Sequence, residues 1–150
     1  MFHLLRARPD FSLPGGILLN FGVYDLSLMP SSITFPDAPI LNLKALKAYT
    51  EAFTPFVSSE ARKLPQYSPL YEDLEQFRGR LSPALFTSGT IDPLLDNTML
   101  ISMKWAIAGG DMVAKYYPGA CHGFLAHPIN EAKVCMRDIT RWLEEKRSSA

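Results

Sequence analysis

Residues 84–95 read Ala84-Leu-Phe-Thr-Ser-Gly-Thr-Ile-Asp-Pro-Leu-Leu95, an apolar run followed by a turn and the start of a helix. The run from Ala84 to Ser88 is short and ends at Gly89, as expected for a strand covered on both faces of a parallel sheet. Asp92-Pro93 is typical of a helix N-cap and the first helical position. Four apolar residues then recur at helical spacing before Gly109-Gly110, namely Leu95, Met99, Met103 and Ile107. This stretch therefore predicts a buried strand followed by a crossover helix.

Two further apolar runs predict strands elsewhere in the chain. Gly16–Tyr24 is opened by Pro14-Gly15 and is apolar almost throughout, which indicates a strand buried on both faces. Met112–Tyr117 is ended by Pro118-Gly119. A final helix is indicated by one apolar stripe, formed by Ala132, Cys135, Met136, Ile139, Trp142 and Leu143. Strands that alternate with helices predict an α/β fold with a three-stranded parallel sheet flanked by helices.

Residues 29–67 have a different pattern, rich in proline and aromatic residues, with one convincing helix at Leu43–Phe53 that Pro55 closes. We interpret this stretch as an excursion above the sheet. Its aromatic residues favour core packing, and a hydrophobic substrate wall is the alternative; they are Phe35, Tyr49, Phe53 and Phe56. No repeat or linker divides the chain, so we expect residues 1–150 to form a single segment of one domain.

Composition excludes several classes of function. The 150 residues carry 15 basic and 15 acidic side chains, and this balance provides no basic field for nucleic acid. Apolar stretches are shorter than the ~20 residues of a membrane span, and the N-terminus lacks a leader pattern, so we expect a cytoplasmic protein. Cys121 and Cys135 form no CxxC motif, which indicates reduced thiols. Neither a phosphate-binding glycine loop nor a metal-ligand cluster is present, so no cofactor and no metal are expected.

Two titratable residues follow the ends of predicted strands, where functional groups collect in open parallel sheets. Asp92 follows the second strand, and His122 lies in the loop after the third, 30 residues later. Neighbouring strands are ~4.8 Å apart, so the two side chains can meet. A carboxylate that is hydrogen-bonded to one imidazole nitrogen fixes the orientation of the ring and stabilises the imidazolium. Such an Asp-His pair makes up two of the three residues of a hydrolytic triad. A helix cap for Asp92 and an exposed loop position for His122 are the alternative interpretations.

Other residues of the same types fit structural roles better. Asp96 lies one turn into the predicted helix, where an acidic side chain complements the helix dipole. His3 and His127 have no comparable partner in the pattern. Cys121 precedes His122 directly, but adjacent side chains generally diverge, which disfavours a Cys-His dyad. Asp92 and His122 are therefore the candidate catalytic residues.

Three motifs together resemble the C-terminal portion of the hormone-sensitive-lipase-like α/β-hydrolases. They are Ser68-Pro-Leu-Tyr71, Gly89-Thr-Ile-Asp92-Pro-Leu-Leu-Asp96 and Tyr117-Pro-Gly-Ala-Cys-His122-Gly-Phe124, and the resemblance runs from about Pro14 onward. It implies a partial α/β-hydrolase fold with a lid-like excursion at residues 29–67. It also implies a carboxylic-ester hydrolase of esterase or lipase type, acting on a small hydrophobic ester, in which Asp92 orients His122.

The sequence departs from this family in lacking both a Gly-x-Ser-x-Gly elbow and a His-Gly-Gly-Gly oxyanion segment. The resemblance therefore implies a serine nucleophile on a missing N-terminal half, and we expect the isolated chain to be inactive. The edge of the Gly16–Tyr24 strand could bind that half or a second copy of the chain. A non-catalytic binding or interaction module on a hydrolase scaffold is the alternative function.

Overall fold

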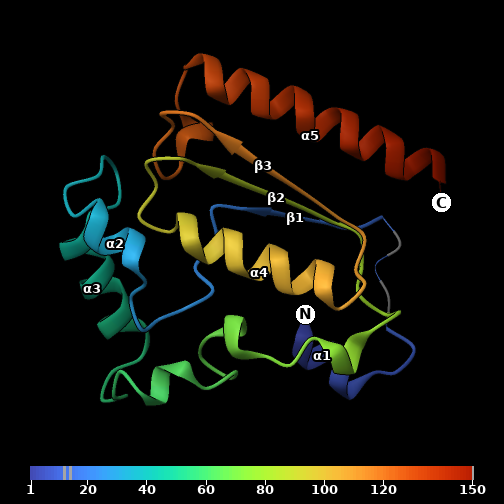
Figure 1. Ribbon diagram of the computed structural model, residues 1–150, viewed down its shortest axis with the longest axis horizontal. Helices are drawn as coiled ribbons and strands as arrows, with labels where there is room; N and C mark the ends of the chain where they lie inside the picture. Colours follow the sequence, from blue (N-terminus) through green and yellow to red (C-terminus); the bar gives the residue numbers. More distant parts are fainter. Residues whose placement is uncertain (12, 14, 150) are drawn as a thin grey trace.

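A computed structural model describes residues 1–11, 13 and 15–149 (Figure 1). The helices and strands, in chain order, are α1 (Phe2–Ala7), β1 (Ile17–Asn20), α2 (Pro30–Thr34), α3 (Leu43–Phe53), β2 (Ala84–Gly89), α4 (Leu95–Ile107), β3 (Met112–Tyr117) and α5 (Asn130–Ser149). Short 3₁₀ turns occur at Ala61–Lys63, Pro69–Tyr71, Glu75–Phe77 and Phe124–Ala126.

The three strands form one parallel sheet in the order β1-β2-β3, which confirms the predicted three-stranded sheet. Ala84 of β2 is in register with Ile17 of β1 and with Met112 of β3. Every residue of the central strand β2 is buried. Because the strands are parallel, their carboxyl ends lie at the same end of the sheet, and the residues that follow β2 and β3 emerge there.

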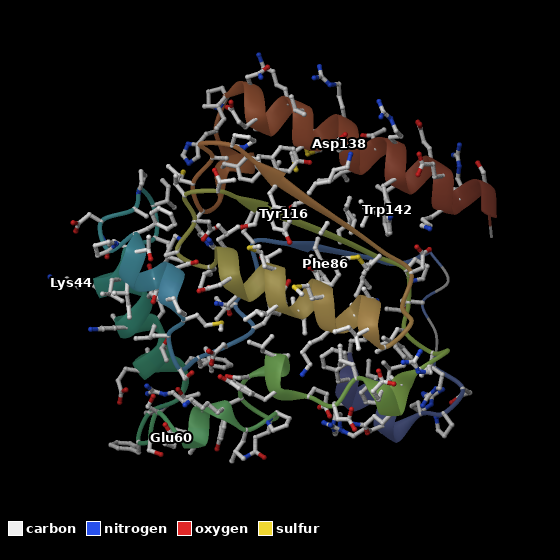
Figure 2. The ribbon with its side chains drawn as sticks, viewed as in Figure 1. Lys44, Glu60, Phe86, Tyr116, Asp138 and Trp142 are labelled. Carbon is white, nitrogen blue, oxygen red and sulfur yellow. The ribbon has the colours of Figure 1, made fainter. Side chains whose placement is uncertain are left out.

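Helices cover both faces of the sheet, as expected for an α/β fold. Helix α5 lies along one face, and α4 and α1 lie on the other (Figure 1). Successive residues of β2 point to opposite faces: Leu85 packs with Trp142 in the cluster under α5, whereas Phe86 packs with Trp105 in the cluster under α4. Figure 2 shows Trp142 and Phe86 on the two sides of the sheet. The core is thus split by the sheet into two apolar layers.

Strand β1 is shorter and less buried than the sequence predicts. It ends at Asn20, and the next residue, Phe21, has a φ of +40° that turns the chain out of the sheet. Leu18 is 38% exposed, so the expectation of a strand buried on both faces is wrong. The strand lies at the edge of the sheet and pairs only with β2 among the described residues. The predicted opening residue Pro14 lies outside the described residues.

Helix α4 begins at Leu95, two residues after the predicted start, so the prediction of Asp92 as its N-cap is wrong. The Asp92 carboxylate instead accepts a hydrogen bond from the Leu94 amide in the turn before the helix, at 2.8 Å. The helix buries Ile101 and Trp105 against the sheet. Three of the four apolar residues that predicted the helix lie on its exposed side, namely Met99, Met103 and Ile107.

The apolar stripe of α5 is narrower than predicted. Ala132, Cys135, Ile139 and Trp142 are buried against the sheet, whereas Met136 and Leu143 are exposed. A sheet of three strands offers only a narrow surface, and one row of side chains covers it. No helix among the described residues combines the length and the apolar character needed to cross a membrane.

Candidate active site

The loops after β2 and β3 are fastened to each other through their backbones. The Thr90 amide donates to the Tyr117 carbonyl at 3.1 Å, and the Ile91 amide donates to the Ala120 carbonyl at 3.2 Å. Gly89 permits this close approach, because a Cβ at that position would lie 2.0 Å from the Ala120 carbonyl oxygen. The two loop tips are therefore held at a fixed separation.

Asp92 and His122 meet at these loop tips. The Nδ1 atom of His122 lies 3.1 Å from Oδ2 and 3.3 Å from Oδ1 of Asp92. Asp92 is fully buried, whereas the His122 side chain remains 21% exposed. Gly123, with a φ of +68°, lets the chain turn directly after His122 into the Phe124–Ala126 turn. The structure thus brings together the two residues that the sequence predicts to meet.

The contact determines which imidazole nitrogen is available for chemistry. An ionised carboxylate can only accept hydrogen bonds, so Nδ1 of His122 carries the proton in this pair. In a neutral imidazole, Nε2 then holds the lone pair, and it has no hydrogen-bond partner among the described residues. An imidazole arranged in this way can take a proton from a neighbouring hydroxyl while the carboxylate stabilises the resulting cation.

His122 opens into an apolar pocket of about 530 Å³. The pocket lies between the segment that follows β1, helix α3 and the Tyr67–Pro69 stretch. Its lining residues are Val23, Leu26, Leu41, Leu46, Tyr49, Thr50, Phe53, Tyr67, Pro69 and His122. A largely apolar cavity with a few polar groups is typical of a small-molecule site.

The aromatic residues of the 29–67 stretch do not form a core, so the core-packing interpretation is wrong for most of them. Tyr49 and Phe53 are 66% and 74% exposed, and both line the pocket beside His122. Phe56 is fully exposed and lies outside this pocket. Phe35 is half-buried and lines a separate surface hollow with Ile91. Because Tyr49 and Phe53 line the pocket, the alternative interpretation of a hydrophobic wall is supported for these two residues.

Two buried polar side chains fasten the segment between β1 and the pocket. The Asn97 side-chain oxygen on α4 accepts hydrogen bonds from the Tyr24 and Asp25 amides at 2.9 and 2.7 Å. The Ser68 hydroxyl oxygen accepts one from the Leu26 amide at 2.8 Å. Sequence reasoning missed Asn97 altogether, because an asparagine within a helical pattern gives no sign of a partner 72 residues away.

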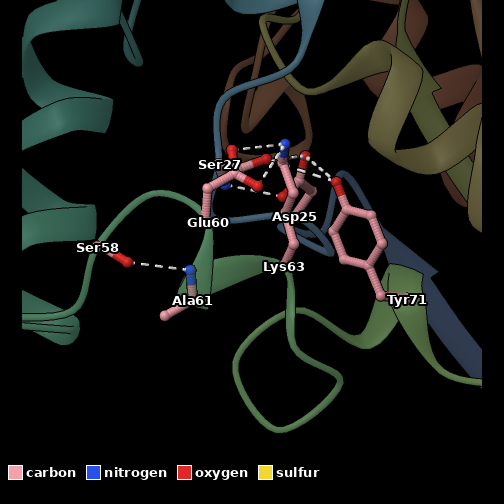
Figure 3. A network of polar contacts seen from close by, with 7 residues as sticks. All are labelled: Asp25, Ser27, Ser58, Glu60, Ala61, Lys63 and Tyr71. Atoms are coloured by element: carbon pink, nitrogen blue, oxygen red, sulfur yellow. Dashed lines mark hydrogen bonds and ion pairs between the residues drawn. The ribbon is translucent and has the colours of Figure 1, made fainter.

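A polar cluster around Asp25 belongs to the same segment (Figure 3). The buried Asp25 carboxylate accepts hydrogen bonds from the Ser27 amide and hydroxyl, and the Tyr71 hydroxyl donates to it at 3.4 Å. Lys63 is paired nearby with Glu60, whose hydrogen bond raises the pKa of the lysine. The contacts to Asp25 hold the turn at residues 25–27, whereas the exposed Lys63–Glu60 pair contributes little to stability.

The other candidate residues take structural positions. The Asp96 carboxylate accepts a hydrogen bond from the Ser31 amide at 2.7 Å and anchors the start of α2 to α4. His3 is exposed and His127 is half-buried. Cys121 and Cys135 are free thiols. Among the described residues, no group of three or more His, Cys, Asp or Glu side chains could hold a metal ion.

Comparison with known proteins shows the family to which this fold belongs. A family model described as alpha/beta hydrolase fold matches residues 1–126. The chain belongs to this family. Solved structures extend the similarity to hormone-sensitive-lipase-like esterases, which confirms the resemblance carried by the three motifs. No curated protein sequence matches the chain.

Three solved structures illustrate the similarity of this alpha/beta hydrolase chain. A thermostable esterase from Pseudomonas putida is 26% identical with a TM-score of 0.79, and the match covers 91% of this chain and 43% of that one. A hormone-sensitive lipase from a metagenome library is 25% identical with a TM-score of 0.79, covering 95% and 48%. Carboxyl esterase 2 from the fungus Tuber melanosporum, at 19% identity and a TM-score of 0.78, shares the fold over 96% and 48%. The chain spans less than half the length of these structures.

Proposed function

We propose that residues 1–150 supply the acid and the base of a Ser-His-Asp triad in a carboxylic-ester hydrolase. Asp92 orients the ring, His122 is the general base, and the serine nucleophile belongs to an N-terminal half outside these residues. The hydrogen bond of 3.1 Å between Asp92 and His122, beside an apolar pocket, is the observation that carries this proposal. The similarity to esterases supports it.

The proposed mechanism uses the free nitrogen of His122. Nε2 takes the proton of the serine hydroxyl as its oxygen attacks the ester carbonyl carbon, and Asp92 stabilises the imidazolium through Nδ1. The imidazolium then gives the proton to the departing alcohol, which leaves an acyl-serine. A water molecule, deprotonated by Nε2, hydrolyses this acyl-enzyme and restores the serine.

The pocket supports a small hydrophobic ester as substrate. Its wall is formed by aliphatic and aromatic side chains, and the volume of about 530 Å³ suits a small ligand. We propose that residues 29–67 act as a lid-like wall, since α3 carries the exposed aromatic residues Tyr49 and Phe53. No residue of this wall supplies a nucleophile in the proposal.

The proposal assigns the missing half to the free edge of β1. Among the residues that the structure describes, no strand pairs with this edge, where Leu18 is 38% exposed, and such edges bind further strands. A strand of the N-terminal half is the proposed partner, and a second copy of the chain is the alternative. Cross-linking from Leu18→Cys would report which of the two lies there.

An ester-hydrolysis assay in two forms of the protein tests the proposal. The 150-residue chain alone should leave p-nitrophenyl butyrate at the background rate. When the chain is expressed with the in-frame coding region upstream of Met1, hydrolysis should appear, and Asp92→Asn or His122→Ala should reduce kcat by about 10³-fold or more. Turnover by the isolated chain that His122→Ala abolishes, or full activity of both variants in the longer protein, would overturn the proposal.

Ligand binding without catalysis is a second candidate function. One observation favours it: side chains of residues 23–69 together with His122 line an apolar cavity of about 530 Å³, a size that suits a small ligand. A binding module would hold a phenyl alkyl ketone equally well in the parent and in Asp92→Asn, because Asp92 does not line the pocket, and it would show no turnover in the longer protein. The ester assay therefore separates the two functions.

A further inference from the structure

Phe21 has an unusual backbone conformation directly beside the candidate active site. Its φ of +40° lies in the left-handed region, which bulky L side chains rarely adopt. The Phe21 amide donates to the Thr87 carbonyl at 2.7 Å, so the backbone is fixed to β2 at this point. On the other side, the Tyr24 amide is fixed to Asn97. Strain of this kind persists only where the surroundings impose it, and it concentrates at functional sites.

The consequence of this turn is the position of the phenyl ring. It meets the imidazole of His122 edge-on, with ring centroids 5.2 Å apart and an angle of 69° between the planes. The same ring contacts Phe124 at 5.9 Å, and Phe124 in turn contacts Tyr117 at 5.3 Å. A row of aromatic rings thus connects the imidazole to the buried layer under α5.

The Asp92 carboxylate holds His122 at a single atom, Nδ1. Besides its covalent bond to Cβ, the ring has only this polar contact among the described residues, and small combined rotations about χ1 and χ2 would still move Nε2 away from a nucleophile. An edge-to-face aromatic contact opposes such motion because it favours one angle between the two planes. Phe21 provides this contact from the residue directly after β1, whereas His122 lies in the loop after β3.

We propose that Phe21 is a positioning residue for His122. It holds the imidazole plane so that Nε2 faces the pocket, and the positive φ of Phe21 is what directs its ring to that place. This inference rests on the proposed role of His122 as general base. Phe21 itself touches no reacting atom.

Imidazole NMR on the full 150-residue chain tests the positioning role without requiring turnover. In the parent, nuclear Overhauser effects should connect the Phe21 ring protons to the His122 ring, and the Nδ1 proton should exchange slowly with solvent. Phe21→Leu should speed this exchange roughly 2- to 10-fold, the factor expected from loss of one aromatic pair. Phe21→Tyr should restore the parent rate.

Phe56→Leu is the matched control. Phe56 also has a positive φ, of +64°, but it is fully exposed and has no ring contact among the described residues. The exchange rate of the His122 proton should not change in this variant, even if the folding stability does.

Two results would overturn the inference. One is an unchanged exchange rate in Phe21→Leu, and the other is the absence of the Phe21–His122 Overhauser effects in the parent, which needs no variant to fold. In the longer protein, Phe21→Leu should lower kcat and leave KM nearly unchanged. If that protein hydrolyses no ester while the NMR results hold, the proposed function fails and the positioning of the ring stands.

Discussion

Two regions border the candidate site, and they are fastened in different ways. The loops after β2 and β3 are joined by backbone hydrogen bonds, such as the one from the Ile91 amide to the Ala120 carbonyl. The segment after β1 is fastened mainly by side chains, above all Asn97 and Ser68. Backbone bonds do not depend on the side chains of the residues they join, apart from the close approach that Gly89 permits, whereas each side-chain bond depends on one residue. The Asp92–His122 pair should therefore tolerate most substitutions in these loops other than at Gly89, and the pocket wall should be sensitive to changes at Asn97 and Ser68.

Gly89→Ala should push apart the loops after β2 and β3, and we expect it to have the largest effect on stability. The added Cβ would lie 2.0 Å from the Ala120 carbonyl oxygen, so the two loops must move apart. We expect a loss of about 3 kcal/mol in the free energy of unfolding, measured with urea. Gly15→Ala is the control, because nothing lies within 4 Å of its Cβ position. Equal stability of the two variants would show that the loops are not packed as described.

Asn97→Ala should make the segment after β1 more mobile, because the Asn97 side chain holds its backbone. The variant leaves the buried Asp25 amide and the part-buried Tyr24 amide without their acceptor, which should cost about 2 kcal/mol. Hydrogen exchange should become faster at residues 24–26 and remain slow at Thr90 and Ile91. Asn42→Ala, which removes only the exposed cap of α3, should cost about 1 kcal/mol and leave these amides unchanged. If hydrogen exchange in Asn97→Ala became faster at Thr90 and Ile91 as well as at residues 24–26, the two regions would not be independent.

A side-chain contact also lies at the end of β3, where the loop to His122 begins, and Asp138→Asn tests it. Asp138 on α5 accepts a hydrogen bond from the hydroxyl of Tyr117, the last residue of β3, and pairs with Lys115. Burial alone would raise the pKa of Asp138, but the hydrogen bonds from Lys115 and Tyr117 outweigh it and hold the pKa below 3.8. Because the folded pKa is lowered, the stabilisation is present above about pH 3.8 and is lost as the pH falls through the folded value.

We therefore expect Asp138→Asn to lower the free energy of unfolding by about 1 kcal/mol at pH 7 and by less at pH 3. Urea titrations at the two pH values measure this difference. Asp37→Asn is the control, since the exposed Asp37 makes no hydrogen bond or ion pair among the described side chains. If Asp138→Asn lowered the free energy of unfolding by the same amount at both pH values, the contacts assigned to the Asp138 carboxylate would be contradicted.

Phe53→Ala probes the wall at its outer surface and should have the smallest effect. Phe53 lines the pocket but is 74% exposed, so its removal should weaken binding of a phenyl alkyl ketone about threefold. Calorimetric titration of the isolated chain measures the affinity. Phe56→Ala should bind the ketone as the parent does, because Phe56 lies outside the pocket. If both variants bind with equal affinity, Phe53 is not part of the wall.

The sequence predicted the contact between Asp92 and His122 better than the surroundings of this pair. Asp92 and His122 could be paired because both follow β-strand patterns separated by one helix, and β3 has the predicted bounds, Met112–Tyr117. The aromatic residues of α3 were predicted to pack inside, although they are exposed at the pocket. A helical pattern shows that Tyr49 and Phe53 share a face, but not whether that face meets a core or a cavity.

The sequence by itself determined the α/β order, the three parallel strands and the meeting of the carboxylate with the imidazole. These features follow from local patterns and from the geometry that every parallel sheet shares. Only the tertiary structure decided that Asn97 holds the segment after β1, that α3 forms a pocket wall and that Phe21 packs its ring on His122. Each of those contacts joins residues far apart in the chain, and their partners are fixed by packing across the sheet, which no local pattern encodes.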